Sequence, residues 1–322
     1  MLRLFWNRLV WAIPVLLVIV VLNFVLVRLA PGDPITSIIG EYPTPEGYAE
    51  QLRAQMGLDR PIHEQLLIYL GHVFQGDLGY SFANRQPVLS LILGKALNTL
   101  ALMVPGLIFA SLLGILIGRV SLSTSARFLD STLTGLSLFG YSVPIFWLGQ
   151  VLIILFAVEL QWLPAQGMFA LQTDLPPFLD YLAHWAMPGF AVTIFYAAIV
   201  ARVARASLKE AVTGDYIVTA LAKGTSQRRL FWRHVLPNGL VPIVSVIGYN
   251  FGLALTGAIL VESVFAWPGL GALFMASIIA RDYPTLQGIF LLAGAAVVVS
   301  NFVTDVVYEI IDPRMRNGSR GA

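Results

Sequence analysis

The sequence predicts an all-α membrane protein, a bundle of helices that crosses the bilayer several times. Of its 322 residues, 57% are hydrophobic and only 12% are charged, and the hydrophobic residues are concentrated in long continuous runs. Such runs favour spanning helices, because the strands of a membrane barrel would show short segments of alternating polarity. The chain contains no cysteine, which excludes a disulfide framework and a thiolate metal site. Its net charge of +2 is too small to indicate nucleic acid as a partner.

Six apolar stretches are each long enough to cross a bilayer, which takes roughly 20 residues. The first stretch also has the charge pattern of a signal peptide, but its length and the lack of a cleavage site favour a retained anchor. The prediction is therefore a polytopic membrane helical bundle with six transmembrane helices, near residues 9–29, 99–120, 133–160, 183–204, 240–262 and 286–311.

Lys and Arg gather in the connections on one side of this bundle. With an even number of crossings both termini share that side, which the positive-inside rule identifies as cytoplasmic. The opposite side holds the first loop, in which acidic residues outnumber basic ones and the segments 45–56 and 61–74 have helical character. The basic side collects Arg3, Arg8, Arg119, Arg127, Arg202, Arg205, Lys209, Lys223, Arg228, Arg229, Arg233, Arg314, Arg316 and Arg320.

The longest predicted cytoplasmic connection is expected to form two short helices separated by a break. Asp215 is the expected N-cap of a helix over 216–223, and Gly224 suits the left-handed position that follows a helix. Ser226 is the expected cap of the second helix, and Pro237 the expected bend into the next crossing.

A helix of two turns is marginal alone in water, so the first of these helices must dock on something. Tyr216, Ile217, Ala220 and Leu221 recur at helical spacing and form its predicted apolar face. From the pattern alone three interpretations stay open: an amphipathic helix on anionic lipid headgroups, a helix packed under the bundle, and a docking element for a cytoplasmic partner.

The stretch "VTALAKGTSQRRLFWRHVLP" resembles the cytoplasmic loop of ATP-binding-cassette (ABC) importer permeases. The family pattern is E-A-A, three residues, Gly, nine residues, Ile-x-Leu-Pro. Aligned on Gly224, the matching residues are Ala220, Gly224, Leu236 and Pro237, and the departures are Val218, Thr219 and His234. Those departures resemble the DYxxTAxAKG form of the dipeptide, oligopeptide and nickel permeases.

Further segments resemble the same family, in order along nearly the whole chain. They are "APGDP", "GDLGYSF", "SLFGYSVPIFWLG", "VESVFAWPGLG", "RDYPTLQG" and "DPRMR". The resemblance implies the type I ABC importer permease fold and the B-type membrane subunit of a peptide importer in a bacterial inner membrane. The alternative cargo is nickel chelates or other small solutes. The rival classes of protein are a self-sufficient secondary transporter or channel and a structural scaffold.

The resemblance also implies that the loop is a coupling helix that seats on an ATPase subunit. The residues implied at or near that contact are Asp215, Tyr216, Thr219, Ala220, Lys223, Gly224, Leu236 and Pro237. The implied partners are a second homologous permease, in a heterodimer rather than a homodimer, two ATPase subunits, a periplasmic substrate-binding protein and membrane lipid. Snorkelling to lipid is the alternative role of Lys223.

The chain carries no catalytic motif of its own. It lacks G-x-x-x-x-G-K-[ST], H-E-x-x-H and G-x-S-x-G, and its four histidines have no close ligand spacing. We therefore expect a transport subunit that is not an enzyme and binds no cofactor or metal, with ATP and Mg²⁺ used by partner ATPases.

Polar residues inside predicted crossings are costly and indicate function or structural pairing. Asp305 and Glu309 fall on one face of the last crossing, and Arg202 and Arg205 lie near the cytoplasmic end of the fourth. A bundle-stabilising ion pair and a gating contact are the two interpretations of these residues. Small-xxx-small pairs such as Gly114 and Gly118 predict close helix contacts.

The predicted organisation has four parts. Residues 1–30 form an N-terminal cytoplasmic segment and the first crossing, and 31–98 form a periplasmic loop with short helices that faces the binding protein or acts as a structural lid. Residues 99–311 form the permease core, with the coupling loop at 205–238, and 312–322 form a cytoplasmic tail.

Overall fold

A computed structural model describes residues 2–29, 35, 39, 45, 47–55, 57–123 and 127–311. The "APGDP" and "DPRMR" motifs and the predicted tail fall wholly or mainly outside these residues. The chain folds into two compact units, Met1–Thr99 with Pro268–Val298, and Leu100–Trp267 with Val299–Ala322.

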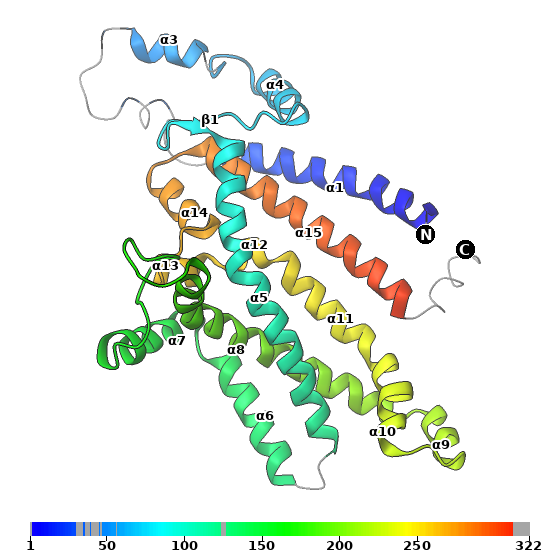
Figure 1. Ribbon diagram of the computed structural model, residues 1–322. Helices are drawn as coiled ribbons and strands as arrows, with labels where there is room; N and C mark the ends of the chain where they lie inside the picture. Colours follow the sequence, from blue (N-terminus) through cyan, green and yellow to red (C-terminus); the bar gives the residue numbers. More distant parts are fainter. Residues whose placement is uncertain are drawn as a thin grey trace. The chain divides into compact units, whose positions relative to one another are not determined.

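The first unit contains the N-terminal helix, the elements of the predicted outer loop and a later helical segment. A two-stranded antiparallel hairpin pairs Tyr80 with Pro87 and Ser81 with Gln86. The elements are α1 (Leu2–Leu29), α3 (Tyr48–Gln55), α4 (Ile62–Phe74), β1 (Tyr80–Ser81), β2 (Gln86–Pro87), the first part of α5 (Val88–Ser123), α14 (Leu270–Ile279) and the first part of α15 (Tyr283–Ile311) (Figure 1).

The second unit contains the rest of α5, the end of α15 and the helices between them in sequence. It includes two π-helical turns, η1 and η2. Its other elements are α6 (Arg127–Ser142), α7 (Ile145–Leu152), η1 (Ile153–Glu159), α8 (Pro177–Val212), α9 (Asp215–Ala222), α10 (Gln227–Leu230), η2 (Phe231–Val235), α11 (Leu236–Gly252), α12 (Ala254–Gly257) and α13 (Ile259–Val264).

Long apolar helices confirm the predicted fold class. Among the described residues, the helices long and apolar enough to span a membrane are Val88–Leu122, Pro177–Val212, Gln227–Gly252 and Tyr283–Ile311. They cover the second, fourth, fifth and sixth predicted crossings. The first predicted crossing lies in α1. Its apolar part, measured over the described side chains, is Ala12–Leu26 and is shorter than the other spans. The helices α3 and α4 confirm the helical character predicted in the first loop.

The third predicted crossing is not one straight helix. It bends by 95° between Ser131–Ser142 and Ile145–Glu159, so a single span over 133–160 is wrong unless the bent pair is counted as one. The break falls at Val143 and Pro144, and Pro144 is the N-cap of α7. Proline has no N–H and disfavours helical geometry at the residue before it, which explains a break at this point.

The fifth predicted crossing begins earlier and ends earlier than the sequence predicts. The span runs from Gln227 through α10, η2 and α11 to Gly252, and after Leu253 the chain continues in the short helices α12 and α13. Pro237 does not break this span. Pro237 lies in the first turn of α11, directly after the π-helical turn η2. Proline is tolerated in the first turn of a helix better than in its interior.

Glycines bring α5 and α8 into close contact within the second unit, as the small-xxx-small spacing predicts. A Cβ at Gly114 would lie 2.6 Å from the Cβ of Val200, and a Cβ at Gly118 would lie 2.7 Å from that of Ala204. Lipid tails are as apolar as leucine, so helix association in a membrane depends on such close packing.

A second close contact joins α11 to the end of α15. A Cβ at Gly248 would overlap the side chain of Thr304, and the Ser300 hydroxyl donates to the Gly248 carbonyl at 2.6 Å. The Ser207 hydroxyl donates to the Gly239 carbonyl at 2.7 Å and ties α8 to α11. These bonds fix α11 between two neighbours.

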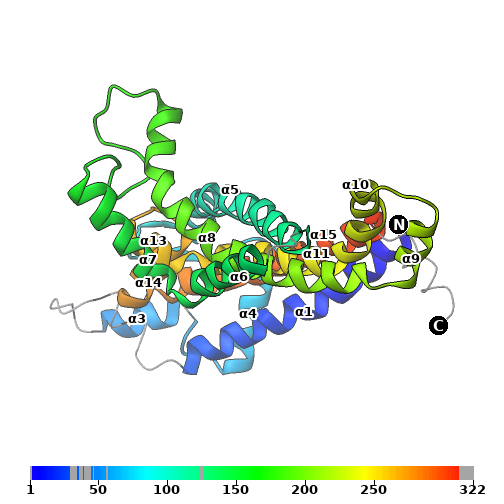
Figure 2. The ribbon, with the colours of Figure 1, turned by 90° about the horizontal axis from the view of Figure 1, so that it is seen from below.

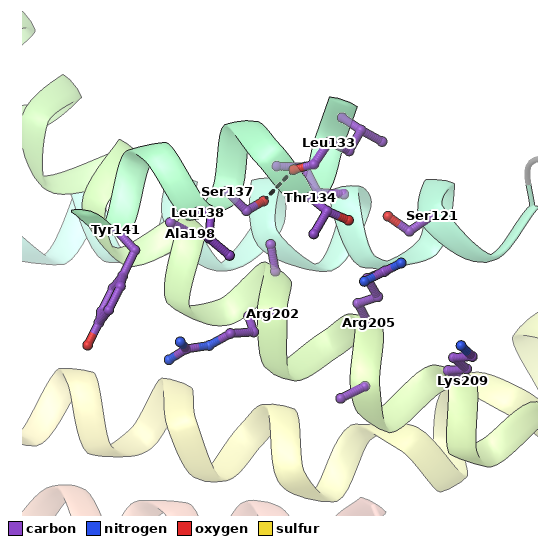
Figure 3. A pocket seen from close by; sticks show the side chains of 13 residues that line it. Ser121, Leu133, Thr134, Ser137, Leu138, Tyr141, Ala198, Arg202, Arg205 and Lys209 are labelled. Carbon is purple, nitrogen blue, oxygen red and sulfur yellow. Dashed lines mark hydrogen bonds between the residues drawn. The ribbon is translucent and has the colours of Figure 1, made fainter. Parts of the chain in front are cut away.

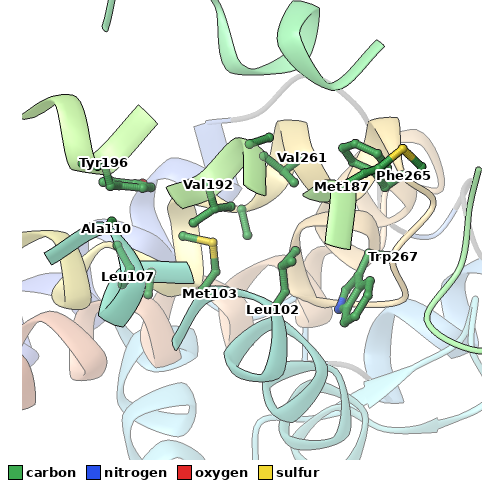
Figure 4. Packing of buried hydrophobic residues seen from close by; sticks show 14 of the residues in the cluster. Leu102, Met103, Leu107, Ala110, Met187, Val192, Tyr196, Val261, Phe265 and Trp267 are labelled. Atoms are coloured by element: carbon green, nitrogen blue, oxygen red, sulfur yellow. The ribbon is translucent and has the colours of Figure 1, made fainter. Parts of the chain in front are cut away.

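Two apolar clusters form the core of the second unit. One surrounds Trp267 and Phe265, both fully buried, with Met103 from α5 and Met187 from α8 (Figure 4). The other joins the ends of α8 and α11 to α9 and α10, through side chains that include Leu208 and Ile243. In Figures 1 and 2, α9 and α10 lie at one end of this unit and α7 and α13 at the opposite end.

A buried carboxylate joins two distant segments of the first unit. Asp282, 6% exposed, accepts hydrogen bonds from the Ser81 hydroxyl at 2.5 Å and the Thr285 hydroxyl at 2.7 Å. Ser81 belongs to β1, and Asp282 and Thr285 lie at the start of α15. The "GDLGYSF" and "RDYPTLQG" motifs therefore meet in the fold.

Candidate functional site

The candidate site is the segment from the end of α8 to the start of α11. Its first helix, α9, has eight residues and follows α8 after only Thr213 and Gly214. Gly214, with φ −71° and ψ 146°, is the N-cap, so the prediction that Asp215 caps the helix is wrong by one residue. Asp215 is the first helical residue, and its carboxylate lies in the first turn, where it complements the positive end of the helix dipole.

Tyr216 explains why a glycine occupies the cap. The Tyr216 ring folds back, and its hydroxyl donates to the carbonyl of Ala211 in α8 at 2.7 Å. A Cβ at Gly214 would lie 2.4 Å from that ring. Partial burial, and to a lesser extent the Glu210 carboxylate, raise the pKa of the Tyr216 phenol, so the hydroxyl stays protonated and donates at neutral pH.

α9 has an inward and an outward apolar face. Ile217 and Ala220 are 4% and 5% exposed and pack in the cluster with Leu208 and Leu230. Leu221, in contrast, is 46% exposed, and Val218, which was not assigned to the apolar face, is 67% exposed. The predicted single face of Tyr216, Ile217, Ala220 and Leu221 is therefore divided: part of it anchors the helix and part of it is accessible.

The end of α9 is a Schellman turn built on Gly224. The Gly224 N–H donates to the Leu221 carbonyl at 2.9 Å, and the Thr225 N–H donates to the Ala220 carbonyl at 3.2 Å. Gly224 has φ +74°, which confirms the predicted left-handed conformation. Lys223 is the C-cap and is exposed, and Thr219 donates from its hydroxyl to the Asp215 carbonyl at 3.3 Å.

The return from α9 is continuous helix into the membrane span. Ser226 occupies the N-cap of α10 as predicted, although its side chain makes no capping hydrogen bond. Leu236 and Pro237 open α11 after the π-helical turn η2. α9 therefore lies between α8, which ends at Val212, and the helical span that begins at Gln227.

An arginine of α5 also holds this segment, and the sequence patterns did not single it out. The Arg119 guanidinium lies 5.0 Å from the ring centroid of Phe231 and 5.1 Å from that of Trp232, both in η2. Cation–π contacts of this kind stabilise by about 0.5–2 kcal/mol, depending on exposure. The adjacent aromatic residues in "LFWRH" are the only sequence signal, and without the fold they do not identify their cation.

The four residues predicted to pair or gate are placed in two helices of the second unit. Arg202 and Arg205 line a cavity between α5, α6 and α8, and the Arg202 guanidinium lies 4.8 Å from the Tyr141 ring centroid. Asp305 and Glu309 lie in the last turns of α15. Their pairing across helices stays a prediction.

Over the described residues, no group of three or more His, Asp or Glu side chains is placed to hold a metal ion. A buried pair is formed by His184, whose Nδ1 lies 3.1 Å from an Asp180 carboxylate oxygen one helical turn earlier on α8.

The long apolar helices define a multi-pass membrane protein. The chain belongs to the family of binding-protein-dependent transport system inner membrane components, whose model matches residues 110–317, and the family's N-terminal model matches residues 1–103. It is thus a multi-pass inner-membrane permease of an ABC importer, and ATP hydrolysis belongs to a separate subunit rather than to this chain.

The chain matches several named permeases over nearly the full length of both proteins. The chain is 37% identical to the dipeptide transport system permease protein DppB of Escherichia coli K12, over 98% of this chain and 99% of DppB. It is 36% identical to the di/tripeptide transport system permease protein DppB of Pseudomonas aeruginosa, covering 97% and 98% of the two chains. It is 38% identical to the glutathione transport system permease protein GsiC of Salmonella choleraesuis, covering 96% and 97%.

A solved structure supports the same fold. The MetNI methionine ABC transporter in an inward-facing conformation contains a chain that matches with a TM-score of 0.57 at 18% identity, over 70% of this chain and 97% of the other. The predicted type I importer permease fold is therefore confirmed.

Proposed function

We propose that this chain imports di- or oligopeptides as one of two permease subunits of an ATP-driven transporter, and that α9 is its coupling helix. The peptide cargo is supported by the names of the full-length relatives, which are dipeptide, di/tripeptide and glutathione permeases. The coupling role is supported by the geometry of α9.

The observation that carries the coupling role is the division of α9 into two faces. An eight-residue helix does not hold its shape alone in water. Ile217 and Ala220 anchor it to the membrane helices, whereas Val218 and Leu221 remain exposed. An exposed apolar face on a short anchored helix suits insertion into a cleft of another protein.

Charge around this face favours a protein surface that carries acidic groups. Lys223, the C-cap of α9, is an exposed basic side chain two residues after Leu221. We assign the exposed face to an ATPase subunit, with Asp215, Thr219 and Lys223 at the edge of the contact. Basic rim residues of this kind affect association rates and salt dependence more than affinity.

The coupling is mechanical in this proposal. Nucleotide binding to two ATPase subunits, which hold ATP and Mg²⁺, favours one arrangement of α9 over the other, and α8 and α11 move with it. A ligand shifts such an equilibrium only by its differential affinity for the two arrangements. The rigidity of the Gly224 turn and the continuity of α10, η2 and α11 support this role.

The remaining assignments complete the transporter. Both termini lie in the cytoplasm, and the second permease is a homologous but distinct chain. The segment 31–98 faces a periplasmic substrate-binding protein, which supplies most of the cargo specificity. Arg202 or Arg205 and Asp305 or Glu309 pair in one state of the transport cycle and act there as a gate.

Reconstitution into proteoliposomes tests this function. The complex of both permeases and both ATPases, supplied with its binding protein, is expected to accumulate a labelled dipeptide only when ATP is present. Val218→Asp with Leu221→Asp is expected to abolish uptake because it places charge on the docking face. Ile279→Asp, at another exposed apolar side chain, serves as the control for added charge. Uptake at full rate without nucleotide, or with both α9 changes present, would refute the proposal.

A further inference from the structure

A cavity of about 320 Å³ lies away from α9, between α5, α6 and α8 in the second unit. One wall is α8, where Arg202, Arg205 and Lys209 follow one another along the cavity (Figure 3). Their spacing of three and four residues places them on one face of the helix, over about 10 Å of its length. None of the three belongs to the apolar cluster that contains Ile217 and Ala220 of α9.

The three basic side chains lie at different distances from the end of α8. Lys209 lies three residues from the end of α8, close to the point where the chain leaves the span. Arg202 lies deeper and contacts the Tyr141 ring. Ala198 and Ala201 of α8 also line the cavity, and their small side chains leave space beside Arg202.

Hydroxyl and apolar groups line the opposite wall. Ser121 of α5 and Thr134 of α6 face the same space as the cationic side chains. Over the part of the chain that the structure describes, the buried Ser121 hydroxyl oxygen has no hydrogen-bond partner. Leu138 lines the cavity and is 59% exposed, and the neighbouring Leu136 and Phe139 are 62% and 66% exposed.

We propose that this cavity binds an anionic phospholipid of the membrane. The phosphate headgroup contacts Arg205, Lys209 and the Ser121 hydroxyl, and an acyl chain follows the exposed apolar side of α6. The proposal goes beyond coupling and cargo, and it requires only that α8 ends at a bilayer surface. Anionic headgroups attract basic residues at this depth, and long basic side chains reach them by snorkelling.

A transported peptide fits the cavity less well than a lipid. A peptide in its zwitterionic form carries an ammonium as well as a carboxylate. The described lining contains three cationic side chains and no carboxylate, so it leaves the ammonium without a partner. The combination of cationic side chains on one wall with apolar side chains on the other, including the exposed Leu138, matches the two-part chemistry of a lipid.

Photo-cross-linking on the complete transporter tests the site. The complex is placed in nanodiscs of phosphatidylcholine that contain a small fraction of phosphatidylglycerol with a photoreactive acyl chain, and the labelled peptides are mapped by mass spectrometry. We expect labelling of α6 near Leu138 and of α8 near Arg202. Replacing the probe with photoreactive phosphatidylcholine is expected to remove that labelling.

Two matched variants separate the cavity from general surface charge. Changing Arg202, Arg205 and Lys209 together to Gln is expected to weaken labelling on the order of 100-fold, at roughly fivefold for each charge. Changing the exposed Arg228, Arg229 and Arg233 to Gln removes the same charge outside the cavity and is expected to leave labelling within about twofold. Lys209→Gln alone, at the end of α8, is the milder variant if the triple change prevents assembly.

Three results would overturn the proposal. No labelling of α6 or α8 in the unaltered complex would indicate that another chain fills the cavity. Equal loss of labelling in both triple variants would indicate attraction by surface charge alone. Displacement of the label by saturating dipeptide would place the cavity on the cargo path instead.

Discussion

The Tyr216 hydroxyl donates a hydrogen bond to the Ala211 carbonyl at 2.7 Å, which ties α9 back to the last turn of α8. Together with buried Ile217 and Ala220, this bond makes α9 an extension of the membrane helix rather than a loose loop. In the proposed coupling mechanism, a force on α9 reaches α8 through these contacts. The bond itself is a single side-chain contact, so its contribution can be removed without changing the volume of the residue.

Tyr216→Phe is expected to loosen α9. A hydrogen bond of this kind contributes about 1 kcal/mol net, so amide hydrogen exchange in α9 should accelerate by roughly fivefold. Hydrogen exchange of the assembled permease followed by mass spectrometry measures this, and Tyr80→Phe, an exposed tyrosine in the first unit, is the control. Unchanged exchange in α9 would mean that the bond does not hold the helix.

Gly224→Ala is expected to distort the turn after α9. Its φ of +74° costs roughly 1–2 kcal/mol for a residue with a Cβ, although no neighbouring atom lies within 4 Å of that position. Gly135→Ala in α6 is the matched control, because it too has no neighbour within 4 Å but its backbone is helical. We expect ATP-driven uptake to fall for Gly224→Ala and not for Gly135→Ala, at equal amounts of complex in the membrane. Equal uptake by both variants would show that the turn is dispensable.

Arg119→Gln is expected to reduce coupling efficiency. The change removes the contacts with Phe231 and Trp232, worth about 0.5–2 kcal/mol, and frees η2 from the end of α5. The ratio of peptide imported to ATP hydrolysed measures the effect, with Arg119→Lys expected to retain part of it. Arg233→Gln removes an exposed cation of the same π-helical turn and should leave the ratio nearly unchanged. A normal ratio for Arg119→Gln would exclude a coupling role for this contact.

Asp282 and Ser81 are expected to stabilise the first unit as a coupled pair. Asp282→Asn and Ser81→Ala should each destabilise it, because each leaves a buried group without its partner. In a double-mutant cycle the interaction energy is expected to be about 1–3 kcal/mol. Thermal unfolding of the detergent-solubilised complex gives the four values, and strictly additive losses would show that the two side chains act independently.

The sequence predicts the helices and the turn at Gly224 because both depend on local chemistry. Long apolar runs identify spanning helices by length, and a glycine after a short helix identifies a left-handed position. Gly114 and Gly118 of α5 are similarly identified by their spacing, and each lies against a residue of α8.

Features that depend on the exact backbone path and on side-chain packing could not be predicted. Pro144 breaks its helix whereas Pro237 does not, and the difference lies in the π-helical turn that precedes Pro237. Gly214 rather than Asp215 caps α9 because the Tyr216 ring occupies the space beside it. The burial of Ala220 and the exposure of Leu221 are likewise set by the packing of α9 against α8 and α10.

Cysteine accessibility on α9 tests the central claim most directly. The chain has no cysteine, so Val218→Cys gives one reporter on the exposed face and Leu171→Cys gives a control reporter away from α9. In the coupling-helix account, a maleimide labels both cysteines when the permeases are purified alone, and assembly with the ATPase subunits protects the cysteine at position 218 only. Equal labelling at position 218 with and without the ATPases would contradict the account.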